Sequence, residues 1–239
     1  MRNAFLSSGR DVKVVLSLVL LLALSLSIAV GQEPYADPIT EEIDLEFWVK
    51  EYSKLGNTAF SRGEFYMRSK RRDRFYYVLV APEDYTTSGS NVTVTLRNVH
   101  GLRTQLGYGL LFHSDPQPLV QDYVFVIDTI TRRYRVARHA ANKEKDVIKW
   151  TRSSLILGGR KENVLEVRDK GSSVDLYINH RFVRSVDTPL AYKMGQPGLY
   201  TDAIPIAFKK FVVIAEDRKR SRTISKFDQK PLSSNQKAP

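Results

Sequence analysis

From Gly63 to Ile214 the chain repeats short runs in which apolar and polar residues alternate, and turn-forming residues separate these runs. In residues 92–97, for example, Val and Leu alternate with Thr and Arg. This is the two-residue period of a strand that buries one face. No stretch longer than about two turns has the apolar spacing of an amphipathic helix in this region. The pattern therefore predicts a body made of strands.

The expected strands are rich in β-branched and aromatic residues. They cover residues 65–67, 75–80, 92–96, 108–112, 123–127, 134–136, 147–150, 164–168, 174–178, 181–186, 198–200 and 207–214. Turns are expected at residues 143–146, 170–172 and 179–180. Many short strands at a spacing of roughly 8 to 15 residues predict an all-β fold, an antiparallel jelly-roll sandwich of two sheets.

The amino-terminal segment predicts export. A basic flank precedes residues 14–30, which contain no charge, Pro or Gly, and small residues follow at the exit. This is the pattern of a signal peptide, with cleavage expected after Gly31 and Ala29 as the second choice. An uncleaved signal anchor is the alternative, because 17 residues only approach the roughly 30 Å thickness of the hydrocarbon core. Both interpretations place the remainder outside the cytoplasm, in the periplasm, the cell envelope or the medium.

Composition excludes several kinds of chemistry. The 239 residues include no cysteine, which rules out disulfides, thiolate metal sites, a catalytic thiol and a lipoprotein anchor. The four histidines are scattered, and we expect no cofactor. Removal of residues 1–31 lowers the formal charge from +11 to +9, because three basic residues and one acidic residue are lost. The exported part is therefore basic.

The chain divides into four expected regions: the signal segment 1–31, a lead-in 32–60, the sandwich 61–215 and a tail 216–239. The tail has seven basic residues against three acidic ones and almost no apolar content, which predicts a disordered segment. If it has a role, it is an electrostatic tether to an anionic surface.

The order of several segments carries a family resemblance. These segments are residues 108–112, 123–138, 150–153, 163–167, 171–179, 195–200 and 208–212. Together they resemble the concanavalin A-like, laminin G-like sandwich domains of bacterial exported proteins, in particular the 3-keto-disaccharide hydrolase-like domain. The resemblance implies a sandwich fold and the processing or binding of glycans. The chain departs from the family at 179–180, where Asn-His replaces Asn-Gly, and at 208–211, where Phe-Lys-Lys-Phe replaces Phe-Asp-Asp-Phe. The second change replaces two carboxylates by two ammonium groups, which argues against calcium binding at that position.

Two acidic motifs resemble functional sites, but a structural interpretation is favoured for each. The E-x-D-x-E pattern at 42–46 resembles the catalytic strand of retaining β-glucanases, where carboxyl groups about 5 to 5.5 Å apart do the chemistry. Only ten mature residues precede Glu42, so a polar lead-in is expected instead. His113, Asp115 and Asp122 suggest a metal site, but a polar loop is the favoured interpretation because no fourth ligand is positioned.

Arginines beside aromatic residues are the candidate ligand-binding feature. Alternation sends Arg133 and Arg135 to the face opposite Tyr134 and Val136. Guanidinium groups there would bind sulfate, carboxylate or phosphate in a bidentate manner. The candidate ligand-binding residues are Tyr123, Arg133, Arg135, Arg138 and Trp150. The alternative is that these charges keep the sheet edges from pairing with other chains.

These observations favour an exported, non-catalytic module that binds a glycan or an anionic envelope polymer. Nucleic acid would suit the charge, but export argues against it as a partner. A glycoside-processing hydrolase, as the family label suggests, is one alternative, although we identify no acid–base pair and therefore no catalytic residue. A structural protein of the cell envelope is the other.

Overall fold

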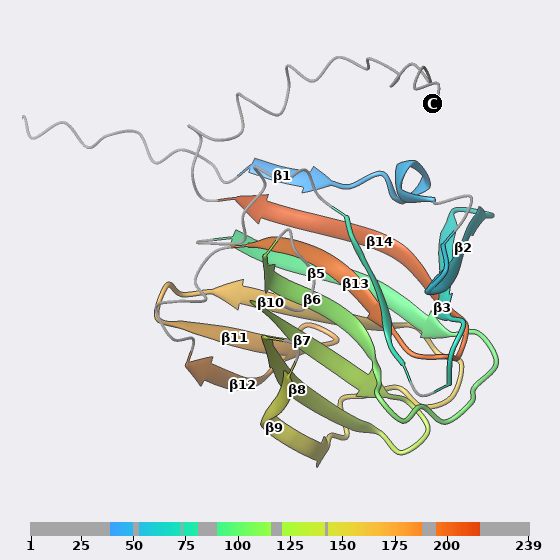
Figure 1. Ribbon diagram of the computed structural model, residues 1–239. Helices are drawn as coiled ribbons and strands as arrows, with labels where there is room; N and C mark the ends of the chain where they lie inside the picture. Colours follow the sequence, from blue (N-terminus) through green and yellow to red (C-terminus); the bar gives the residue numbers. More distant parts are fainter. Residues whose placement is uncertain are drawn as a thin grey trace, which may run out of the picture. The chain divides into compact units, whose positions relative to one another are not determined.

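A computed structural model describes residues 39–49, 53–72, 74–80, 90–115, 121–141, 143–187 and 195–215. The expected signal segment with its cleavage point at Gly31, and the basic tail, lie outside these residues. Within the described part of the chain, no helix is long and apolar enough to cross a membrane. The strands form two antiparallel sheets that pack face to face, which confirms the predicted sandwich (Figure 1).

The larger sheet has eight strands. They are β1 (Ile39–Glu42), β2 (Gly56–Ser61), β3 (Glu64–Ser69), β5 (Ser90–Asn98), β10 (Asn163–Asp169), β11 (Ser173–Ile178), β12 (Arg181–Asp187) and β14 (Ile206–Ala215). Their spatial order is β12-β11-β10-β5-β14-β3-β2, and β1 also pairs with β14. Figure 1 shows β14 running between β1 and β5. Strand β1 and all of β2 except its last residue lie inside the expected lead-in 32–60, so part of that segment belongs to the sheet.

The smaller sheet has six strands. They are β4 (Tyr76–Leu79), β6 (Tyr108–Ser114), β7 (Gln121–Asp128), β8 (Arg133–Ala140), β9 (Lys143–Arg152) and β13 (Gln196–Thr201). Their order is β4-β13-β6-β7-β8-β9, which leaves β9 at one edge.

The turn expected at residues 143–146 is wrong, because these four charged residues begin strand β9. Their alternation is one of charge rather than hydrophobicity: Glu144 and Asp146 share a face and both bind Arg135 on the neighbouring strand β8. Cross-strand ion pairing therefore extends the strand where apolar alternation is missing. The turns expected at 170–172 and 179–180 are confirmed.

The core lies between the sheets, and its largest fully buried side chains are aromatic. Phe112 and Phe125 enter it from the six-stranded sheet, and Phe208 and Phe211 from the eight-stranded sheet, all fully buried. The two phenylalanines of β14 are three residues apart, a spacing that would normally place them on opposite faces. A register shift between Phe208 and Lys210 brings both to the core.

The turn between β11 and β12 offers a stability test. Asn179 and His180 both have positive φ, 50° and 63°, which is the conformation of a type I′ hairpin turn. A residue with a Cβ atom is strained in this backbone conformation, whereas glycine adopts it freely. We therefore expect His180→Gly to raise the free energy of unfolding by about 0.5–1 kcal/mol, measured by urea denaturation.

Asn179→Gly is the matched control for this turn. The Asn179 side chain accepts a hydrogen bond from the Val164 amide (2.8 Å) and donates one to the Leu155 carbonyl (2.8 Å). We therefore expect this variant to lose stability, although it relaxes the same backbone. A His180→Gly variant less stable than the wild type would contradict the strain argument.

Candidate functional site

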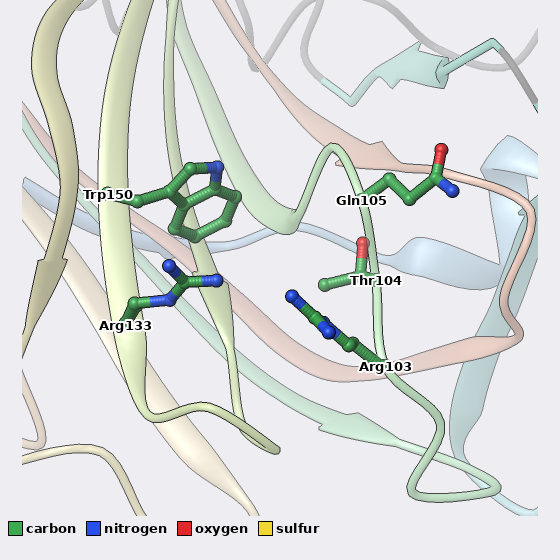
Figure 2. Close-up of a pocket in the computed structure, with 5 residues that line it drawn as sticks. All are labelled: Arg103, Thr104, Gln105, Arg133 and Trp150. Carbon is green, nitrogen blue, oxygen red and sulfur yellow. The ribbon is translucent and has the colours of Figure 1, made fainter.

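A pocket of about 610 Å³ opens at one end of the six-stranded sheet. The residues that line it are Arg103, Thr104, Gln105, Arg133 and Trp150. Figure 2 shows Trp150 and Arg133 on neighbouring strands and the other three on the facing loop, which connects β5 to β6.

A buried carboxylate positions the loop. Asp202, just after β13, accepts hydrogen bonds from the Thr104 hydroxyl and from the amide of Gln105 (3.0 Å). The Thr104 hydroxyl oxygen in turn accepts a hydrogen bond from the Gly107 amide (2.8 Å). The Leu106 amide also donates to Asp202 (3.4 Å). Three successive loop residues are thus held by one side chain almost 100 residues later in the chain, which fixes one wall of the pocket.

A glycine allows the Trp150 ring to lie against the sheet. A Cβ atom at Gly107 would be 2.6 Å from Cγ2 of Val126 and 2.9 Å from Cη2 of Trp150. Gly107 also has a φ of +90°, which side chains rarely adopt. The indole ring is only partly buried, so one part of it remains available to a ligand.

Two guanidinium groups line the same pocket as this ring, Arg133 beside it and Arg103 on the facing loop (Figure 2). The Arg133 guanidinium lies 5.6 Å from the centroid of the Trp150 ring, and its Nε donates to the Thr131 hydroxyl (3.0 Å). Among the described residues, neither Arg133 nor Arg103 has a carboxylate partner. The pocket therefore presents an apolar ring face beside two positive charges, which suits a ligand with an apolar face and polar or anionic substituents.

Arg135 is placed differently from Arg133. It lies on the face opposite Tyr134 and Val136, as alternation predicts, but it is buried and bound by Glu144 and Asp146. Two carboxylates neutralise its charge. The structure therefore holds Arg135 as part of an internal network rather than as a free anion-binding group.

Tyr123 and Arg138 lie away from the pocket. They are direct cross-strand partners on β7 and β8, so both side chains are on the same face of the sheet, opposite to Arg135. The Tyr123 ring is buried in the core and stacks on Phe112, with 5.4 Å between the ring centroids. Of the five candidate residues, the structure brings Arg133 and Trp150 together at the pocket.

A buried network beside Arg135 escaped sequence analysis. His139 Nδ1 contacts Asp122, and its Nε2 lies 3.0 Å from Glu144 Oε2. Burial would lower the pKa of His139, but the hydrogen bonds to Asp122 and Glu144 outweigh it and raise this pKa to about 9. The hydrogen bond to His139 and the nearby Arg135 lower the pKa of Glu144 to about 2. The Phe75 ring covers His139 at 5.2 Å between centroids.

The side chains of the two acidic motifs have other partners in the structure. His113 Nε2 contacts Asp169 of the opposite sheet (3.1 Å), whereas Asp122 binds His139, so the proposed metal ligands point to different partners. In the motif 42–46, Glu42 ends β1 and pairs with Lys210 of β14. The Asp44 carboxylate instead caps the 3-10 turn η2 (Leu45–Trp48). These carboxylates therefore do not share one strand face.

The loop residues of the pocket were missed because no periodicity marks them. Arg103, Thr104 and Gln105 lie between two strands in a segment without alternation. The only relevant signal, a carboxylate at Asp202, is distant in sequence and becomes meaningful only in the folded chain.

No protein-family model matches the chain, and no curated protein is significantly similar to it. Among solved structures, the carbohydrate binding module CBM66 from Bacillus subtilis is similar over 74% of this chain and 95% of its own, at 15% identity and a TM-score of 0.54. A second similar structure is a protein of unknown function with a galectin-like fold, also from Bacillus subtilis. The match covers 77% of this chain and 91% of that protein, at 10% identity and a TM-score of 0.47.

The likeness to CBM66 is one of fold, and it agrees with the two-sheet antiparallel sandwich that the resemblance implies. Membership in the 3-keto-disaccharide hydrolase-like family stays a prediction, since no family model matches.

Proposed function

We propose that this chain is an exported, non-catalytic β-sandwich module that binds a glycan in the pocket at Trp150. The observation that carries the proposal is a pocket that holds the partly exposed Trp150 ring together with Arg133 and Arg103, neither of which has a carboxylate partner among the described residues. The indole face provides apolar contact for the C–H face of a sugar ring, and the guanidiniums donate hydrogen bonds to hydroxyl or acidic substituents.

Two further observations support a binding role. The fold is similar to that of a carbohydrate binding module, which shows that such a sandwich accommodates this kind of function. In addition, the five described lining residues include no carboxylic acid and no histidine. Glycoside hydrolysis normally uses a pair of carboxyl groups, so this lining favours binding over cleavage.

Export completes the proposal and rests on the pattern of residues 1–31. Amino-terminal sequencing of the protein recovered from its host tests it directly. A mature chain that begins at Gln32 is the expected result, and a full-length chain confined to the cytoplasm would contradict export.

The central prediction concerns Trp150. We expect Trp150→Ala to weaken binding of a glycan identified on an array by at least about tenfold, because the stacking surface is lost. Arg133→Gln and Arg103→Gln should each weaken it while leaving the ring in place. Titration calorimetry with the purified protein measures these effects.

Phe182→Ala is the matched control, since Phe182 is another exposed aromatic side chain, on the edge strand β12 away from the pocket lining. We expect its affinity to equal that of the wild type. Equal losses in the Phe182 and Trp150 variants, or an array without any binding, would overturn the proposal. Release of reducing sugar from a bound glycan would instead favour the hydrolase alternative.

A further inference from the structure

Three connections meet around the pocket, and we call them together the loop end. They are residues 99–107 between β5 and β6, 129–133 from the turn after β7 to the first residue of β8, and 152–161 from the last residue of β9 onward (Figure 1). The first lies against the third, since a Cβ atom at Gly101 would be 3.4 Å from Cγ of Arg160. Hydrogen bonds tie the second and third together. The Thr129 hydroxyl donates to the Gly159 carbonyl (2.7 Å), and the Ser153 amide donates to the Arg132 carbonyl (3.0 Å). The loop end is therefore one continuous surface.

This surface carries a single sign of charge. Its three segments contain no Asp or Glu, and their cationic residues are Arg103, Arg132, Arg133, Arg152, Arg160 and Lys161. Within the described part of the chain, none of these six forms an ion pair. Arg133 and Arg152 are even direct cross-strand partners, an arrangement of like charges that costs stability. Two acids border the segments: Asp128, across from Arg133, is buried and bound by the turn, and Glu162 pairs with Lys209. The exposed charge of the loop end is therefore predominantly positive, which suits an anionic partner.

Each of the three segments also exposes one large aliphatic side chain. The exposed fractions are 50% for Leu102, 43% for Ile130 and 45% for Leu157. Single exposed aliphatic residues are common on proteins, but here each lies within a few residues of an unpaired arginine on adjoining connections. The loop end therefore combines positive charge with separate apolar side chains.

We propose that the loop end docks on an anionic lipid surface, with the cations at the headgroups and the three aliphatic side chains in the outer acyl region. Charge complementarity requires an anionic partner, and the aliphatic side chains distinguish a lipid layer from a polyanion in solution. A fluid acyl layer accepts scattered apolar side chains without a complementary groove. Cations near such a surface each add to the attraction. The proposal does not depend on which glycan the pocket binds.

Trp150 provides a local probe, because the chain has two tryptophans and only this one lines the pocket at the loop end. In the full chain carrying Trp48→Phe, we expect vesicles of phosphatidylcholine with about one quarter phosphatidylglycerol and brominated acyl chains to quench Trp150 fluorescence. Vesicles of brominated phosphatidylcholine alone should not. Equal quenching by both vesicles, or quenching by neither, would overturn the proposal.

Two sets of substitutions separate charge from apolar insertion. Arg132→Gln, Arg160→Gln and Lys161→Gln combined should weaken vesicle binding on the order of 100-fold. Leu102→Gln, Ile130→Gln and Leu157→Gln combined should abolish the quenching of Trp150 and leave only attachment that salt removes. All six side chains are exposed, so the fold should be retained.

The matched control combines Arg181→Gln, Arg184→Gln and Val147→Gln, which are exposed residues of edge strands outside the loop end. We expect its vesicle binding to be unchanged. Equal loss in the control, or equally tight binding of a sulfated glycan or DNA without quenching by anionic vesicles, would overturn the proposal. Because the substituted residues do not line the pocket, glycan affinity should persist in all three sets, which separates a failure of this proposal from a failure of the glycan-binding proposal.

Discussion

At pH 7, His139→Leu should lower the free energy of unfolding by about 3–5 kcal/mol, because it leaves a buried carboxylate without its partner. His139 lies on β8 between Asp122 of β7 and Glu144 of β9. The Asp122 side chain is only 1% exposed, so water cannot replace the lost contact. Glu144 is more exposed and keeps Arg135, so the loss is dominated by Asp122.

Urea denaturation of the single and double variants measures this effect. Asp122→Leu combined with His139→Leu removes the unpaired charge, so the double variant should be more stable than His139→Leu alone. His100→Leu is the control, since His100 is exposed in the β5–β6 connection and should change stability by less than about 0.5 kcal/mol. A loss below about 1 kcal/mol in His139→Leu would contradict a charged, buried pair.

Stability should also fall between about pH 6.5 and pH 10 in the wild type, because this interval spans the unfolded and folded pKa values of His139. The pKa of His139 is about 9 in the folded chain, against an ordinary value of 6.5. Because the folded pKa is above the unfolded one, His139 keeps its proton in the folded chain between about pH 6.5 and 9, where the unfolded chain has lost it. The contribution of His139 is therefore fully present below about 6.5 and is lost as the pH passes through about 9, with a size of about 3 kcal/mol.

The opposite sign holds at acid pH. The pKa of Glu144 is about 2 in the folded chain, against an ordinary value of 4.5. Its contribution is present above about 4.5 and is lost as the pH falls through about 2. The network formed by His139, Asp122, Glu144, Arg135 and Asp146 should therefore be most stabilising in the interval between these two transitions.

Unfolding free energies measured at about pH 6.5, 8 and 10 test the basic transition. The wild type should lose stability over this series, whereas His139→Leu should show a much flatter profile. His100→Leu should follow the wild type. A wild-type profile as flat as that of His139→Leu would show that His139 is not protonated in the folded chain at neutral pH.

The arginines show how far sequence analysis reached into the candidate site. Alternation correctly separated Arg135 from Tyr134 and Val136, because side-chain direction in a strand follows from the local backbone. It could not reveal that Arg135 is neutralised, since its partners Glu144 and Asp146 lie on the next strand, in a segment without apolar alternation. Register and strand length there depend on pairing, which a single strand's pattern does not contain.

By itself, the sequence determined that the body is a sandwich of antiparallel strands, because alternation and turn residues act over a few positions. It also placed Arg133 and Trp150 among the candidate residues. Only the tertiary structure decided which residues surround Trp150. Asp202 holds residues 104–106 in place from far along the chain. Hydrogen bonds join two further connections, and Arg160 lies against Gly101 of the first, so the three form the loop end. Such surfaces arise from contacts between distant segments, and a loop without periodicity carries no local signal of its neighbours.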